Sequence, residues 1–216
     1  SRIEMTPLLT PSLVFLGGYT GTLYALNKFD GQALYRFAAG PPLTAQLGQY
    51  DLLAYVASQD YTVYAMDIVP GRTLWRFAGG GPIVAKPAVD DEDVYVTPEG
   101  VGLYRIGREH GEILWRRTNA ERFLASDMRL VYASDRLGRL LVLDRGTGNQ
   151  LGILQEAQNF VFPIANEFTD RVYLASNDGL VISVHDRRHA KPVLMKKPPP
   201  PPPPGKKQII DEDIDF

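Results

Sequence analysis

The hydrophobic pattern of this chain consists of short apolar runs separated by turn-forming residues. In one representative stretch the runs are residues 86–89, 94–97, 102–106 and 112–116. Short runs rich in β-branched and aromatic residues, with turn chemistry between them, are typical of antiparallel strands in a meander. No part of the repeating region carries a sustained 3.6-residue period, so we expect almost no helix.

The pattern returns about every 40 residues, five times in all. One aromatic position recurs at intervals of 40, 40, 37 and 41 residues. Two further positions of the repeat recur at nearly the same intervals. A repeat of this length built from short strands predicts the blades of a β-propeller. The predicted blades are residues 3–37, 43–77, 83–117, 122–154 and 160–196. The recurring aromatic position is occupied by Phe15, Tyr55, Tyr95, Tyr132 and Tyr173.

Some predicted strands are apolar on both faces, as in residues 23–26 and 63–66. A sheet with one face in water does not tolerate this pattern, whereas a blade packed between two neighbours requires it. We therefore predict an all-β domain over residues 1–197, with about five four-stranded antiparallel blades in a small ring or a partial ring. The last outer strand is expected at residues 193–195.

An eleven-residue element joins the third and fourth predicted strands of each copy, for example residues 25–35 and 65–75. Its glycines stand where a tight hairpin needs a positive φ. Its carboxylates can accept turn amides, and its terminal aromatic is large enough to cover the neighbouring blade. These roles are structural, and the residues concerned are Gly31, Tyr35, Asp67, Gly71, Trp75, Gly111, Trp115, Asp144 and Gly148.

The element resembles the tryptophan-docking motif, Ala-x-Asp-x-x-Thr-Gly-x-x-x-Trp, of quinoprotein-like propellers with PQQ-like repeats. Asp67, Gly71 and Trp75 match it, as do Asp144, Thr147 and Gly148. The resemblance is to the non-catalytic branch that includes outer-membrane assembly lipoprotein propellers. It implies a scaffold for protein–protein interaction in the periplasm or cell envelope of a bacterium, with no enzymatic activity and no cofactor.

Two other functions compete with the scaffold. The catalytic branch of the family implies a quinone-dependent oxidoreductase, of which this chain would be a fragment. Those enzymes resemble eight-bladed rings with calcium and often a vicinal cysteine pair, whereas this chain has five copies and no cysteine. The other alternative is a propeller that binds carbohydrate or a small molecule in an aromatic funnel, for which Tyr19, Tyr50 and Tyr61 are candidates.

Composition narrows the function classes only slightly. The 216 residues are 44% hydrophobic with a net charge of −2, which favours neither nucleic acid nor an anionic membrane as partner. The absence of cysteine excludes disulfides, thiol nucleophiles and thiolate metal sites. No apolar run is long enough to span a bilayer. Because the chain begins with Ser1, we expect a processed protein or a fragment.

Candidate chemical sites are few. His110, His185 and His189 fall in or near predicted turns without zinc-site spacing, and surface positions are expected for them. The acidic run at residues 90–93 can attract calcium but lacks the alternate ligand spacing and glycine of a dedicated loop. We expect it to be a solvated acidic turn.

Arginine is concentrated between Arg105 and Arg145, where nine arginines share the stretch with six acidic residues. Arginine suits bidentate contacts with carboxylates, so Arg116 and Arg117 are candidates for binding an acidic partner surface. The alternative is a solvated rim of the third and fourth blades.

The composition changes abruptly after Lys197. Seven prolines, residues 198–204, favour a polyproline II spacer of roughly 22 Å. The segment beyond it is acidic, and we expect it to be disordered alone. It can add as a strand to a partner or to a neighbouring copy, or serve only as a solubilising tail. Its candidate partner-binding residues are Ile209, Ile210, Ile214 and Phe216.

Overall fold

The computed structural model describes residues 5–18, 20–160 and 162–197, which form five antiparallel sheets and one 3₁₀ helix. The first sheet contains β1 (Leu8–Leu9), β2 (Leu13–Gly17), β3 (Thr22–Asn27) and β4 (Ala33–Ala38). The second contains β5 (Gly48–Tyr50), β6 (Leu53–Ala57), β7 (Thr62–Asp67) and β8 (Arg72–Ala78). The third contains β9 (Ala88–Val89), β10 (Asp93–Val96), β11 (Leu103–Gly107) and β12 (Ile113–Arg117).

The remaining elements form the last two sheets. The fourth sheet contains β13 (Arg122–Ser126), β14 (Leu130–Ser134), β15 (Leu140–Asp144) and β16 (Gln150–Leu154). The helix η1 (Gln155–Asn159) leads to the fifth sheet, which contains β17 (Phe162–Ile164), β18 (Val172–Ala175) and β19 (Val181–Val184). Each sheet is a meander whose strands lie side by side in chain order.

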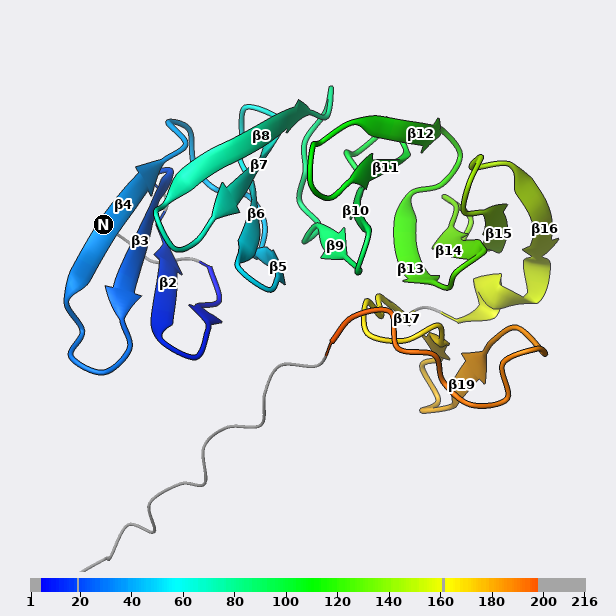
Figure 1. Ribbon diagram of the computed structural model, residues 1–216. Helices are drawn as coiled ribbons and strands as arrows, with labels where there is room; N and C mark the ends of the chain where they lie inside the picture. Colours follow the sequence, from blue (N-terminus) through cyan, green and yellow to red (C-terminus); the bar gives the residue numbers. More distant parts are fainter. Residues whose placement is uncertain (1–4, 19, 161, 198–216) are drawn as a thin grey trace, which may run out of the picture.

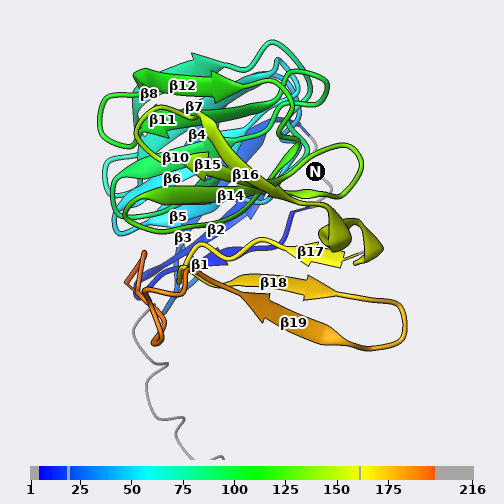
Figure 2. The same ribbon diagram turned by 90° about the vertical axis from the view of Figure 1, so that its right-hand side faces the viewer.

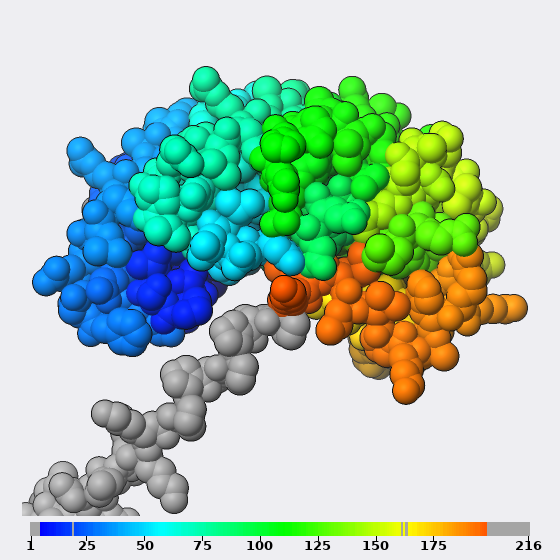
Figure 3. Space-filling view, viewed as in Figure 1, coloured from blue at the N-terminus to red at the C-terminus, as the bar shows by residue number. Residues whose placement is uncertain are grey.

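The five sheets are propeller blades placed one after another around an arc (Figure 1). The inner strands β5, β9 and β13 lie on the concave side, and the outer strands β8, β12 and β16 lie on the convex side. The first and fifth sheets occupy the two ends of the arc in the space-filling view (Figure 3). The all-β propeller architecture predicted from the 40-residue period is therefore confirmed.

Burial on both faces of the middle strands confirms that neighbouring blades stack against each other. In β6, the consecutive residues Ala54, Tyr55, Val56 and Ala57 are all fully buried. Alternate residues serve different clusters, because Tyr55 packs toward the third sheet while Val56 packs toward the first. Side chains of a strand point alternately to its two faces, so only a sheet with neighbours on both sides buries every residue.

Aromatic residues in the middle of the outer strands β4, β8 and β12 dock on the next blade. The Tyr35 hydroxyl donates to the carbonyl oxygen of Ile68 at 2.5 Å. Trp75 Nε1 donates to the carbonyl of Arg108 at 3.0 Å, and Trp115 Nε1 donates to the carbonyl of Arg145 at 2.7 Å. The three carbonyls stand at the same position of successive repeats. The same hydrogen bond therefore sets the spacing between blades one and two, two and three, and three and four.

Glycine is required directly beneath each docked ring. A Cβ atom on Gly71, Gly111 or Gly148 would lie within 2.7 Å of the ring that covers it. All three have a φ between 70 and 74°, as the hairpin demands. Gly31 shares this backbone conformation at φ 72°, but nothing lies within 4 Å of its Cβ position. The first blade thus has the turn of the repeat without a ring above it.

Within the described residues the fifth sheet has three strands, so the expectation of a fourth strand at residues 193–195 was wrong. Leu194 forms an isolated bridge with Thr169, and Met195 N–H donates to the carbonyl of Phe168 at 2.8 Å. Two local causes are visible in the sequence. His189 and Ala190 stand where the other repeats place a turn glycine, and Pro192 has no N–H to donate to a strand ladder.

We expect Gly111→Ala to destabilise the protein by about 2–4 kcal/mol, because the methyl group meets the Trp75 ring in addition to the strained φ. The matched control is Gly31→Ala, which has the same φ and open space and should cost only about 1 kcal/mol. Urea unfolding of both variants measures the difference. Equal losses would show that the docked ring does not constrain the turn.

Candidate interaction surface

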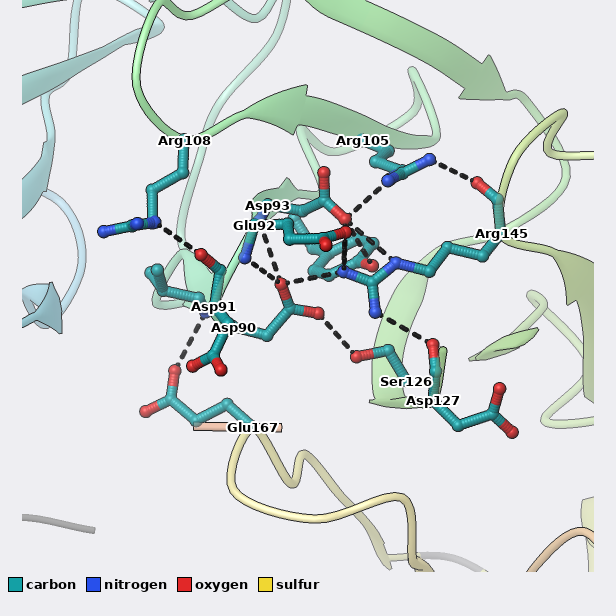
Figure 4. Close-up of polar contacts among 12 residues, drawn as sticks. Asp90, Asp91, Glu92, Asp93, Arg105, Arg108, Ser126, Asp127, Arg145 and Glu167 are labelled. Carbon is teal, nitrogen blue, oxygen red and sulfur yellow. Dashed lines mark hydrogen bonds and ion pairs between the residues drawn. The ribbon is translucent and has the colours of Figure 1, made fainter. Parts of the chain in front are cut away.

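A buried ion network joins the third and fourth blades (Figure 4). Arg145, whose side chain is 5% exposed, places Nη2 at 2.6 Å from Asp93 Oδ2 and 3.1 Å from Asp90 Oδ1. Its Nη1 donates to the carbonyl of Asp127 at 2.8 Å, and Ser126 Oγ donates to the second oxygen of Asp90. One guanidinium therefore satisfies two carboxylates of the neighbouring blade.

A second arginine completes this network. Arg105 Nε lies 2.7 Å from Asp93 Oδ2, and its Nη1 donates to the carbonyl of Arg145 at 2.6 Å. Burial raises the pKa of Asp90, while the Arg145 charge opposes that shift. The expectation of a fully solvated acidic turn at residues 90–93 was wrong for Asp90 and Asp93, which are buried. The reason is that Arg145, 52 residues away from Asp93, folds against them.

Glu167, in the connection between β17 and β18, ties the fifth blade to the third. Its Oε2 accepts the Val89 N–H of inner strand β9 at 3.0 Å. Its Oε1 lies 2.6 Å from Lys86 Nζ and 3.1 Å from Lys196 Nζ. Asp91 N–H also donates to the carbonyl of Met195 at 3.0 Å. The segment after β19 is therefore held on the concave side, against the third blade.

A cleft of about 600 Å³ opens where the third and fourth blades meet the β17–β18 connection. The stacked rings of Tyr95 and Phe123 line it, with centroids 4.4 Å apart. Two exposed apolar side chains border it, Val84 at 54% and Phe168 at 38%. Charged residues of both signs surround these apolar groups, namely Lys86, Glu99, Glu121, Arg122, Arg136 and Glu167.

The comparison with protein families decides which propellers this chain is related to. The family model described as outer membrane protein assembly factor BamB matches residues 19–197. The chain belongs to this family. Among curated proteins, no sequence matches it.

Solved structures share the fold of this BamB family member at low sequence identity. The crystal structure of BamB from Moraxella catarrhalis is 17% identical, with a TM-score of 0.65 over 83% of this chain. The computationally designed Ika8 protein is 19% identical, with a TM-score of 0.66 over 83% of this chain. This chain spans 57% of the length of each of these two structures.

The arginines proposed for partner binding lie on the outer strand β12 of this BamB family member. Arg116 is exposed, donates through Nε and Nη2 to the carbonyl of Val101, and covers the Tyr104 ring. Arg117 Nε donates to Asn119 Oδ1 at 2.9 Å. Arg116 is thus held by its own blade, whereas Arg117 also contacts the fourth blade, where its Nη2 donates to Gln150 Oε1 at 3.4 Å. The candidate tail residues, Ile209, Ile210, Ile214 and Phe216, lie outside the described residues.

Of the candidate ligand aromatics, the two that the structure describes, Tyr50 and Tyr61, lie at opposite ends of β6. Tyr50 stands at the end of β5, where its ring packs under the Arg108 guanidinium at 4.3 Å. Burial, with help from Asp91, raises the pKa of Tyr50 to about 12. Tyr61 lies in the turn between β6 and β7 with a φ of 65°. Tyr19 lies outside the described residues.

The described part of the chain offers no ready metal site. Across residues 5–18, 20–160 and 162–197, no three histidine or acidic side chains are grouped to hold an ion. His110 and His185 are exposed in turns, while His189 Nδ1 lies 3.4 Å from Asp170 Oδ2. The buried carboxylates of Asp90 and Asp93 already face guanidinium groups, so they do not fit calcium coordination. Over the same described residues, no helix has the length and apolar character to cross a membrane.

We expect Arg145→Met to destabilise the protein by about 3–5 kcal/mol at neutral pH, since it leaves Asp90 and Asp93 buried without a countercharge. The loss should shrink toward about pH 5, because burial raises the pKa of Asp90 and the variant lacks the Arg145 charge that opposes this shift, so the folded state takes up a proton before the unfolded chain does. Urea unfolding at the two pH values measures this. The control is exposed Arg116→Met, for which we expect a change within about 0.5 kcal/mol.

Proposed function

We propose that this chain is part of a non-catalytic propeller scaffold that binds a protein partner in the periplasm or cell envelope of a bacterium. The observation that carries the proposal is the match of residues 19–197 to the outer membrane protein assembly factor BamB family. By the same relationship we propose a role in assembling proteins at the outer membrane. The repeat positions of the chain are occupied by residues that hold blades together, which supports a framework role.

The cleft bordered by Val84 and Phe168 is the surface we assign to the partner. Exposed apolar side chains inside a ring of mixed charges have the composition of a protein–protein contact. The cleft lies between rigidly docked blades, so a partner can bind without ordering the surface first, which lowers the entropic cost of binding. We propose Arg116 and Arg117 as a second, peripheral contact for acidic groups.

Site-specific crosslinking tests the assignment of the cleft. A photoreactive amino acid at Val84 should crosslink to one defined envelope protein in the cells that make this chain. The same amino acid at Phe29, which is 81% exposed in the β3–β4 turn, is the control and should not. With that partner purified, Phe168→Glu should weaken binding about tenfold or more with an unchanged melting temperature. Equal crosslinking at both positions would contradict the proposal.

Addition of pyrroloquinoline quinone and calcium tests the non-catalytic assignment. We expect neither an increase in melting temperature nor dye reduction, because the buried carboxylates Asp90 and Asp93 are already paired with Arg145 and Arg105. The control is a quinone-dependent dehydrogenase assayed in parallel. A clear rise in melting temperature with added quinone would favour the oxidoreductase alternative.

A further inference from the structure

Among the residues that the structure describes, the fifth blade has no outer strand of the kind found in the other four blades. In the first four sheets an outer strand, β4, β8, β12 or β16, pairs antiparallel with the third strand. In the fifth sheet, the described residues give β19 one neighbour, β18. Figure 2 shows β19 at the outer margin of this sheet. One position of the repeating architecture is therefore open.

The backbone of β19 offers a template for another strand. The Ser176 N–H donates to the carbonyl of Leu180 at 2.9 Å, which fixes the phase of the β18–β19 ladder. Successive residues of an antiparallel strand direct their backbone N–H and C=O groups alternately to one neighbouring strand and to the other. Ile182 and Val184 therefore bond to β18, and the backbone groups of Val181 and Ser183 face the free edge. Such unpaired edges attract further strands.

The same sheet also leaves apolar side chains uncovered. Leu180 is 53% exposed and Val181 is 59% exposed. Tyr173 is half-buried, although Tyr95 and Tyr132, at the same position of the repeat, are buried. A strand placed beside β19 would remove part of this surface from water and pair its free backbone groups.

We propose that residues 208–216 of the same chain supply the fourth strand of the fifth blade by pairing with β19. Their sequence alternates in large part: in an extended segment Ile210, Ile214 and Phe216 share one side with Gln208 and Glu212, and Asp211, Asp213 and Asp215 share the other with Ile209. Alternation of this kind is typical of a strand with one buried face. The segment is acidic, and the turn that follows β19 carries the exposed bases Arg187, Arg188 and Lys191.

The connection is long enough for pairing within one chain. Leu194 is bridged to Thr169. Three residues further along the chain, Val172 pairs with Val184 of β19. Lys197 is therefore at most about 35 Å from the free edge of β19. Seven prolines and the residues up to 209 span about 38 Å when extended. The tail would reach the Val184 end first and run antiparallel to β19, as the outer strands do in the other blades.

Amide hydrogen exchange tests the pairing residue by residue. We expect the Val181 and Ser183 amides to exchange about tenfold or more slowly in the full chain than in a chain lacking residues 208–216. The Ile182 and Val184 amides, which face β18, serve as the internal control and should exchange equally in both proteins. Equal rates at Val181 and Ser183 in the two proteins would overturn the proposal.

A tail variant and a concentration series complete the test. Ile210→Asp with Ile214→Asp should abolish the added protection as the deletion does, whereas Asp211→Asn should largely retain it. Pairing within the chain makes the protection independent of protein concentration, because the linker sets a constant effective concentration. Protection that rises together with dimer formation in sedimentation experiments would overturn the proposal in favour of a second copy. The outcome does not depend on the proposed function.

Discussion

The docking of one aromatic ring on the glycine turn of the next blade is the contact on which the arc depends. The ring lies on the glycine while its N–H or O–H donates to a carbonyl three residues earlier in the same turn. The hydrogen bond fixes where the ring sits, and the missing Cβ fixes how closely it approaches. For Tyr35, burial raises the pKa to about 12, so its hydroxyl stays protonated and keeps donating. Together these constraints hold adjacent sheets at a spacing that their apolar faces can fill.

Where this contact is missing, the blades are joined differently. Gly152 stands at the aromatic position of the fourth repeat, so the outer strand β16 supplies no aromatic ring to dock on the fifth blade. Ala157 of η1 fills part of the space instead, in the same cluster as Val172 and Leu174 of β18. Glu167 adds polar contacts that reach back to the third blade. The fifth blade is thus held by its inner connection more than by its outer rim, in keeping with a sheet that ends at β19 within the described residues.

The structural features that recur from copy to copy could be predicted from the sequence, whereas features that occur in a single copy could not. The strands, the glycine turns and the docked aromatics recur at fixed intervals, so one copy supports the interpretation of the others. The Arg145 network has no equivalent in the other copies and joins residues more than 50 positions apart. Residues 193–195 likewise turn inward because they bind Thr169 and Phe168. The local sequence pattern gives no sign of these two contacts. Both features depend on contacts between residues that are far apart in the sequence. The hydrophobic pattern of a local segment does not reveal such contacts.

Positions that recur in every repeat hold the blades together, whereas positions that differ between repeats are free to bind a partner. The repeat positions already have structural roles, because each docked ring and the glycine beneath it hold two blades together, and the carboxylates of Asp67 and Asp144 accept hydrogen bonds within their own turns. The cleft is lined instead by segments between strands, such as Val84 before β9 and Phe168 before β18. These positions differ from copy to copy, so they can change without loosening the stack of blades. In a repeat scaffold, recognition is therefore expected at the connections nearest the inner strands, where exposed Val84 and Phe168 lie among charged side chains of both signs.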